Sequence, residues 1–309
     1  MKSLIDHRAL LEHLPNHLEA PLFPEGEEQR CAIIMAHFGT TDREAREQAI
    51  EPLNELVRKS FPGIEVREVY TSRIIMKRLK DRGEVWENLP IAMERLKEEG
   101  YKYLLIQPSV IIDGVEMESI RRDVEMYRSH FEEVRVSTPL LYHPLDYFAL
   151  ADCLRSDFDG VVAYVGHGTY DSSTAQYAFL QQVLQRKGIR NIIISTIEGY
   201  PDFEDLLQQL EEREELRRVH GKTLPTKEPV LLLPLMFVAG LHAKEDIAGE
   251  WLEELESRGY PTSTDPCGLG EIPTIQQLYI NKMDFALHYR AWDIMKKKKI
   301  YTTTGQKMD

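Results

Sequence analysis

Two histidines and one glutamate in the C-terminal half of the chain have the chemistry of metal ligands. His242 lies in GLHAKE at 240–245, His167 in VVAYVGHGTY at 161–170 and Glu198 in IIISTIEGY at 192–200, and each follows an apolar run. Imidazole nitrogens suit divalent first-row metals such as Co, Ni, Fe and Zn, and a carboxylate can complete the ligand set. The three residues lie far apart in the sequence, so only the fold can bring them together.

Each of these residues also has a plain structural interpretation. His167 and His242 could hydrogen-bond to loop carbonyls, and Glu198 could cap a helix that begins near Pro201. Taken singly, each residue favours the structural interpretation. Taken together, at the ends of three consecutive strands, they favour ligation, because open α/β sheets bind ligands beyond the carboxyl ends of their strands. The sequence therefore predicts a metal site made by His167, Glu198 and His242.

Two GT turns, at 39–40 and 168–169, each separate an apolar run from a helical segment. Free backbone NH groups at such turns attract anions, although turn formation alone would also explain the residues. Both turns lack the lysine and the glycine spacing of a P-loop or a dinucleotide fingerprint, so we expect no nucleotide. No GxSxG elbow is present, and no cysteine stands beside the candidate histidines, so nucleophilic catalysis has no visible agent.

Apolar runs of strand length alternate with amphipathic helical segments along the chain. CAIIMAHF at 31–38 is followed by apolar residues at helical spacing, and the pattern restarts with VVAYVGHGT near residue 160. Strands that are apolar throughout are typical of parallel sheets with helices on both faces. We expect an α/β fold with two similar doubly wound halves, whose parallel sheets face a central cleft.

Three matches in the same order indicate that the two halves are duplicates. HFGTTD at 37–42 matches GHGTYD at 166–171, and QPSVIIDGVE at 107–116 matches LPLMFVAGLH at 233–242. In the third and weaker match, Ser72 aligns with Glu198. Two such halves present the carboxyl ends of their strands to a shared cleft. The candidate site residues are those that follow the strands: His37, Ser72, residues 110–116, His167, Glu198 and the segment that leads to His242.

The predicted organisation has four parts. They are an N-terminal extension at 1–29, a first α/β domain at 30–150, a second α/β domain with the metal site at 151–270, and a C-terminal helix with a basic tail at 271–309. The final helix is expected to cover 274–295. Residues 211–228 carry few apolar side chains and predict a solvated helix end and a loop.

The composition is that of an ordinary globular protein, with 42% hydrophobic and 29% charged residues. Lys and Arg total 38 against 51 Asp and Glu, and the formal charge of −13 argues against a general surface for nucleic acid. A small polyanionic ligand is compatible with this charge, because helix N-termini and a few well-placed arginines can bind carboxylates locally.

The cysteines and the N-terminal residues indicate the compartment. Cys31, Cys153 and Cys267 are odd in number and far apart, which fits neither a disulfide framework nor a zinc-binding spacing. Asp6 and Glu12 interrupt the region where a signal peptide needs an apolar run, and no segment reaches about 18 apolar residues. We expect a cytoplasmic protein that binds neither nucleic acid nor membrane, and a homo-oligomer is compatible with the sequence.

The motifs of this chain resemble those of the anaerobic sirohydrochlorin cobaltochelatases, class II chelatases that are related more distantly to ferrochelatase. The resemblance runs from about Cys31 to Ala286. Its specific pieces are FGT at 38–40, YTSRIIMKRL at 70–79, IIDGVEMESI at 111–120, TPLL at 138–141, GHG at 166–168, IEGYP at 197–201, PLMFVAGLHA at 234–243 and GLGEIPTI at 268–275.

The resemblance implies a fold and a site. It implies two α/β halves related by a pseudo-twofold axis, a tetrapyrrole-sized cleft between them, and a C-terminal helix that returns to the first half. It implies that His167 and His242 bind the metal, with Glu198 beside them. For the tetrapyrrole cleft, we expect contacts from Gly39, Thr40, Glu116 and Gly168.

The resemblance also implies a reaction, the insertion of Co²⁺ into sirohydrochlorin or precorrin-2 in anaerobic cobalamin biosynthesis, without ATP and without a second subunit. Two pyrrole protons must leave as one dication enters, so His167 and His242 are assigned to metal delivery and proton acceptance. Glu198 is assigned to ligation or charge balance. The alternatives are an Fe²⁺ or Ni²⁺ chelatase for another tetrapyrrole, and a non-catalytic carrier of tetrapyrrole or metal.

Two residues depart from the pattern of the family. Members usually carry a histidine in a segment like LHIIxG, where this chain has Val110 in SVIIDG. Members often have SFGT where this chain has His37 in HFGT. The acid and base groups of the first half are therefore altered, while His167, Glu198 and His242 are all present.

Overall fold

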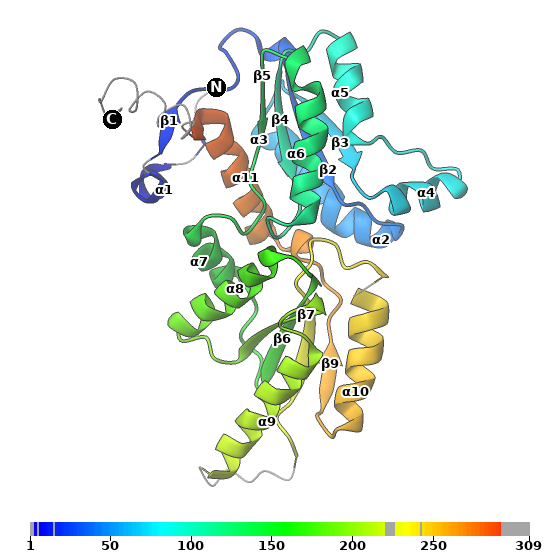
Figure 1. Ribbon diagram of the computed structural model, residues 1–309, viewed down its shortest axis with the longest axis vertical. Helices are drawn as coiled ribbons and strands as arrows, with labels where there is room; N and C mark the ends of the chain where they lie inside the picture. The colour runs from blue at the N-terminus through cyan, green and yellow to red at the C-terminus, as the bar shows by residue number, and fades with distance from the viewer. Residues whose placement is uncertain (1–2, 5, 15, 220–225, 242, 292–309) are drawn as a thin grey trace.

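The structure is a computed structural model that describes all residues except 1–2, 5, 15, 220–225, 242 and 292–309. Figure 1 shows two lobes stacked along the long axis, each built on a parallel sheet with helices packed around it. No helix within the described residues is long and apolar enough to cross a membrane.

The first sheet has the strand order β3-β2-β4-β5 and is parallel throughout. Its strands are β2 (Cys31–His37), β3 (Glu65–Tyr70), β4 (Tyr103–Pro108) and β5 (Glu133–Val136). All seven residues of β2 are buried. Ile33 and Met35 pack with α3 on one face, while Ile34 and Ala36 pack with α5 and α6 on the other. This alternation explains why the strand reads as a continuous apolar run.

The helical elements of this lobe connect its strands. They are α2 (Arg43–Ala45), η2 (Arg46–Ile50), α3 (Glu51–Ser60), α4 (Arg73–Asp81), α5 (Leu89–Glu98), α6 (Val115–Tyr127) and η3 (Arg128–His130). Polar caps start two of them directly after strands. The Asp42 side chain accepts from the backbone NH of Glu44 and Ala45, and Ser72 Oγ accepts from that of Ile75.

The second sheet repeats the arrangement with the order β7-β6-β8-β9, again parallel. Its strands are β6 (Val161–Thr169), β7 (Ile192–Gly199), β8 (Val230–Pro234) and β9 (Thr262–Thr264). Its helical elements are η4 (Ser172–Thr174), α8 (Ala175–Arg186), α9 (Phe203–Val219), η5 (Ala243–Trp251) and α10 (Leu252–Ser257). The predicted α/β fold with two similar parallel-sheet halves is confirmed, because the second, first, third and fourth strands of each half lie side by side in that order.

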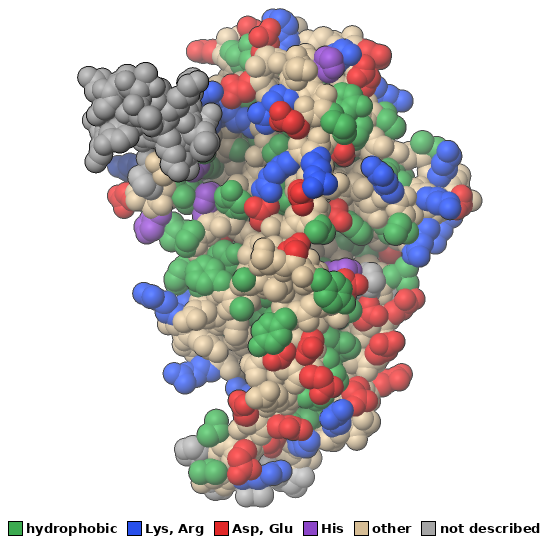
Figure 2. Space-filling model, viewed as in Figure 1, with side chains coloured by type: hydrophobic (Ala, Val, Ile, Leu, Met, Phe, Trp, Pro, Cys, Tyr) green, Lys and Arg blue, Asp and Glu red, His purple; other side chains and the backbone are tan. Residues whose placement is uncertain are grey.

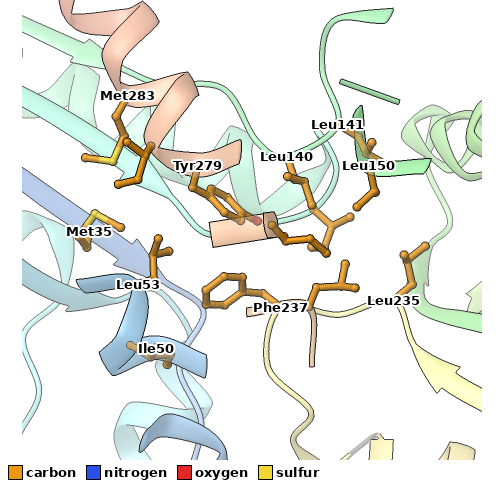
Figure 3. Packing of buried hydrophobic residues seen from close by; sticks show 14 of the residues in the cluster. Met35, Ile50, Leu53, Leu140, Leu141, Leu150, Leu235, Phe237, Tyr279 and Met283 are labelled. Atoms are coloured by element: carbon orange, nitrogen blue, oxygen red, sulfur yellow. The ribbon is translucent and has the colours of Figure 1, made fainter. Parts of the chain in front are cut away.

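One hydrophobic core runs through both lobes. Figure 3 shows Phe237, which follows β8 of the second sheet, beside Leu53 of α3 and Tyr279 of the C-terminal helix. Leu140, Leu141 and Leu150 lie nearby. The rings of Phe237 and Tyr279 meet edge to face with centroids 5.4 Å apart. The two sheets are therefore joined by packing as well as by the chain.

Helix α11 (Pro273–His288) carries the chain back to the first sheet. It follows η6 (Leu269–Glu271) and contacts α3, β4 and α7 (Pro144–Cys153). Its Tyr279 hydroxyl lies 3.1 Å from the carbonyl oxygen of Ser109 and 3.2 Å from that of Val110. The segment that follows β4 is thus held from the C-terminal part of the chain.

The two ends of the described chain differ from the expectation. The final helix stops at His288 rather than at residue 295, and β10 (Tyr289–Ala291) then pairs antiparallel with β1 (His17–Glu19). The N-terminal segment also contains α1 (Arg8–His13) and η1 (Glu28–Arg30). Helix α9 covers the first part of 211–228 as predicted, and the lysine tail lies outside the described residues. The four-part division of the chain stays a prediction.

Candidate functional site

A cavity of about 750 Å³ lies where the carboxyl ends of strands from the two sheets meet. Its lining comes from the segments that follow β2, β4, β6 and β8, from the ends of β6 and β7, and from α4, α6 and α8. Both halves therefore contribute to one cavity, in the place where parallel α/β sheets bind ligands.

The second half contributes His167 and Glu198 to this cavity. His167 lies near the end of β6 with its side chain exposed, and its Nδ1 is 3.4 Å from the Gly168 carbonyl oxygen. Glu198 lies near the end of β7, half-buried, and Gly168 is its partner in the β6–β7 register. The sheet thus delivers an imidazole and a carboxylate to the same wall.

Gly168 makes this close strand approach possible. It has φ +86°, which L side chains rarely adopt, and a Cβ at this position would lie 1.7 Å from the Glu198 carbonyl oxygen. Only glycine fits such a position without moving the backbone. The GHG motif therefore sets the position of Glu198 as well as that of His167.

His242, the third predicted metal ligand, lies outside the described residues. Its neighbours Gly240 and Leu241 line the cavity. Among the residues that the structure describes, no group of three or more His, Cys, Asp or Glu side chains comes together as a metal cluster. The site of His167, Glu198 and His242 thus stays a prediction, of which two members line one cavity.

The predicted tetrapyrrole contacts Gly39, Thr40, Glu116 and Gly168 all line the cavity. Glu116 comes from the first turn of α6, and Thr71 Oγ1 lies 3.5 Å from its Oε2. Burial raises the pKa of Glu116 above its ordinary value, while Thr71 and the nearby His167 partly oppose that shift. A carboxylate of the first half thus lies within electrostatic reach of His167.

His37 lies behind the cavity wall rather than in it. Its side chain is fully buried, with Nδ1 2.8 Å from Ser109 Oγ and Nε2 3.0 Å from Asn54 Oδ1. Asn54 uses its amide NH₂ to donate to Glu68, so its oxygen faces His37, and Nε2 must carry the imidazole proton. Burial lowers the pKa of His37 to about 4, so the ring is neutral at pH 7.

The other first-half candidates have separate places. Ser72 caps α4, and Val110 lines the cavity as an apolar residue. The first half therefore presents Glu116, and not a histidine, to the cavity within the described residues.

Sequence reasoning missed the cavity's apolar rim and its cation. Phe38, Val115, Tyr170 and Leu241 line the cavity, yet their side chains are 42% to 82% exposed. Arg78 of α4 is the only Lys or Arg among the described lining residues. The basic residues of YTSRIIMKRL could have indicated a cation near this edge of the sheet, although Arg78 itself lies within α4 and not at the end of β3.

A second cavity of about 880 Å³ lies between the N-terminal segment, β5, α7 and α11. It contains none of the predicted site residues. Buried ionisable side chains at or beside it have partners, as in Lys282 with Asp146 at 2.7 Å and His7 with Asp284 at 2.9 Å. The first cavity is therefore the candidate site.

Two parallel α/β lobes that share one cavity at their strand ends define a class of proteins that hold a ligand between two sheets. Within that class, the chain belongs to the cobalt chelatase (CbiK) family, whose sequence model matches residues 31–288.

Two curated relatives are sirohydrochlorin cobaltochelatases. The enzyme of Salmonella typhimurium is 29% identical over 269 residues, covering 83% of this chain and 96% of the relative. The enzyme CbiKC of Nitratidesulfovibrio vulgaris is 30% identical over 239 residues, covering 74% of this chain and 80% of the relative. The sequence-based assignment to this family is thus confirmed.

A solved structure has the same fold. The sirohydrochlorin chelatase SirB from Bacillus subtilis subspecies spizizenii, crystallised in complex with cobalt, matches with a TM-score of 0.54 at 12% identity. The match covers 84% of this chain and 95% of that chain. At this identity the likeness concerns the fold alone.

Proposed function

We propose that this protein is a chelatase that inserts Co²⁺ into sirohydrochlorin, with the metal ion as a substrate. The observation that carries the proposal is one cavity with His167 and Glu198 on its second-half wall and Glu116 on its first-half wall. Membership of the cobalt chelatase family supports the same reaction, as do two relatives named as sirohydrochlorin cobaltochelatases.

The reaction requires that one dication enters the macrocycle while two pyrrole NH protons leave it. We assign His167 and His242 to holding the metal, because neutral imidazole binds divalent first-row ions near neutral pH. Glu198 is the third ligand or balances the charge of the ion. These three residues belong to the second α/β domain, 151–270, which in our proposal is the metal-delivering part.

Proton acceptance is shared with the opposite wall. Burial raises the pKa of Glu116, which makes its carboxylate a stronger base than that of an ordinary glutamate. Its proximity to His167 allows the two groups to take protons from the macrocycle as the metal passes between them. His167 and His242 remain acceptors in this proposal, with Glu116 added to them.

The rim of the cavity would hold the macrocycle itself. Phe38, Val115, Tyr170 and Leu241 offer apolar surface that a flat conjugated ring can cover. Gly39 and Thr40 from the first half and Gly168 from the second half also line the cavity, so the macrocycle can approach the backbone closely on both sides. We also propose that the reaction uses no nucleotide and takes place in the cytoplasm, as the turn sequences and the cysteine pattern predict.

An insertion assay tests the proposal directly. Purified protein, sirohydrochlorin and Co²⁺ should change the visible absorption of the pigment faster than the same mixture without protein. His167→Ala should remove the acceleration, as should His242→Ala. His130→Ala is the matched control, because His130 is exposed on η3 and does not line the cavity.

The same assay with Fe²⁺ and Ni²⁺ separates the alternatives. Faster insertion of one of these ions than of Co²⁺ would replace the metal in the proposal and keep the reaction. Pigment binding with no acceleration for any of the three ions would contradict the enzyme and favour a non-catalytic carrier.

A further inference from the structure

Helix α4 presents an unusual set of cations beside the cavity. It carries Arg73, Lys77, Arg78 and Lys80, all with exposed side chains. Ile75 and Arg78, one helical turn apart, line the cavity, while the other three cations point elsewhere on the exposed surface of the helix. One cation thus enters the lining, and three lie next to it.

None of these four cations is used in an ion pair within the described residues. Nearby arginines of the same lobe are paired, as Arg95 is with Glu87, Arg121 with Asp113 and Arg122 with Glu118. On exposed helices, acidic neighbours at i±3 or i±4 commonly neutralise such cations. Helix α4 leaves Arg78 available to a ligand instead, whereas Arg73 lies close enough to Asp123 to oppose the rise that burial causes in the pKa of that carboxyl.

The surroundings make this local charge more significant. The protein has a net charge of −13, and the other charged residues in the cavity lining are the acids Glu116, Asp171 and Glu198. Figure 2 shows Lys and Arg side chains gathered at the margin over α4, while Asp and Glu predominate on the same side of the second lobe, over α10. A polyanion that approaches the cavity is therefore attracted to its α4 edge and repelled from the acidic side of the second lobe.

We propose that Arg78 binds a peripheral carboxylate of the tetrapyrrole and orients the macrocycle in the cavity, while Arg73, Lys77 and Lys80 attract the polyanion to that edge. This inference rests on the proposed function, because sirohydrochlorin carries acetate and propionate groups around its ring. Arginine suits the role, because its planar guanidinium can donate two hydrogen bonds to one carboxylate. Arg78 is then a specificity-determining residue, separate from the metal ligands.

Pigment binding without metal tests this inference independently of catalysis. Metal-free sirohydrochlorin is titrated into wild type, Arg78→Ala and Arg78→Lys, and the pigment's absorption or fluorescence reports the Kd. Arg78→Ala should raise Kd by about 10-fold or more, the effect of one charge-assisted hydrogen-bonded pair. Arg78→Lys should recover part of the affinity, because it restores the charge but not the paired hydrogen bonds.

Two controls identify the cause. Arg186→Ala removes an exposed arginine at the end of α8 that does not itself line the cavity, and it should leave Kd unchanged. The octamethyl ester of sirohydrochlorin lacks the carboxylates, so it should bind wild type and Arg78→Ala with equal affinity. With Co²⁺ present, Arg78→Ala should raise KM and keep kcat close to that of wild type.

The inference is overturned if Arg78→Ala binds free sirohydrochlorin with the same Kd as wild type. It is also overturned if Arg78→Ala weakens binding of the octamethyl ester as much as it weakens binding of sirohydrochlorin. Failure of the proposed function would give a different experimental result. The protein would then bind sirohydrochlorin in a manner that depends on Arg78 but would insert no metal.

Discussion

The two halves of the molecule have the same sheet order but place a histidine at the end of the central strand in opposite environments. His37 ends β2, where it is fully buried between Ser109 and Asn54. His167 lies near the end of β6, where its side chain is exposed and lines the cavity. The comparison teaches that the repeated fold supplies the positions, whereas the residues around each strand end decide between structure and chemistry.

The turns beside these histidines show the same contrast. Gly39 and Gly168 both have a positive φ, +93° and +86°. An added Cβ at Gly39 would meet the ring of Tyr70 at 2.4 Å, whereas at Gly168 it would meet the Glu198 backbone at 1.7 Å. The first turn therefore packs against a side chain, and the second packs against a strand that carries a candidate ligand.

The largest expected effect comes from adding a methyl group to each turn. Gly168→Ala should destabilise the protein by about 4 kcal/mol and abolish metal insertion, because the strained φ and the clash together displace the backbone of Glu198. Gly39→Ala should cost about 1–3 kcal/mol and keep measurable insertion, because the Tyr70 ring can shift. Urea unfolding and the insertion assay measure both effects. Equal loss of activity in the two variants would show that the halves are not specialised in this way.

A second experiment uses the pKa of His37, which is lowered from 6.5 to about 4 by burial. The unfolded chain takes up a proton near pH 6.5, but the folded state does so only near pH 4, so stability falls as the pH decreases between these values. This contribution amounts to about 3 kcal/mol at pH 4. His37→Gln should lose correspondingly less stability than wild type between pH 7 and pH 4 in urea unfolding.

The comparison with His37→Gln isolates this one group. The pKa of His143 is also lowered to about 4, with burial as the main cause, but His143 is present in both proteins and its contribution cancels. Parallel pH dependences of wild type and His37→Gln would mean that His37 is protonated in the folded state near its ordinary pKa, contrary to its burial.

The smallest of the three effects concerns the first half's contribution to catalysis. Glu116→Gln should slow metal insertion by about 100-fold, equivalent to about 2.7 kcal/mol, if the carboxylate accepts a proton during the reaction. In wild type, the rate should rise as the pH increases through the raised pKa of Glu116, and this rise should disappear in the variant. Glu116→Asp should retain it. Identical pH–rate profiles for wild type and Glu116→Gln would place all proton acceptance on the second half.

The elements and their arrangement were largely predictable from the sequence. Apolar runs such as 31–38 and 161–169 specify strands buried on both faces, and the GT turns after them specify where the helices begin. The final helix was predicted too long because the helical spacing continues past His288. Pairing of 289–291 with 17–19 depends on contacts between the two ends of the chain, which local periodicity does not contain.

The site was predictable only in part. His167 and Glu198 were found because the ends of parallel strands meet at one edge of a sheet, a rule that needs no side-chain detail. The same rule selected His37, whose burial depends on Asn54 and Ser109 and is therefore a matter of tertiary packing. Arg78 was missed for the opposite reason, since it reaches the cavity from the flank of a helix and not from a strand end.

The bond that Tyr279 makes to the carbonyls of Ser109 and Val110 has a consequence for biosynthesis. A ribosome that has just completed the first sheet has not yet made the residue that holds one wall of the cavity, which lies 170 positions after Ser109. The nascent first lobe therefore emerges with that wall unsupported. The cavity can reach its final shape only after nearly the whole polypeptide has left the exit tunnel, so substrate binding by half-made chains is disfavoured.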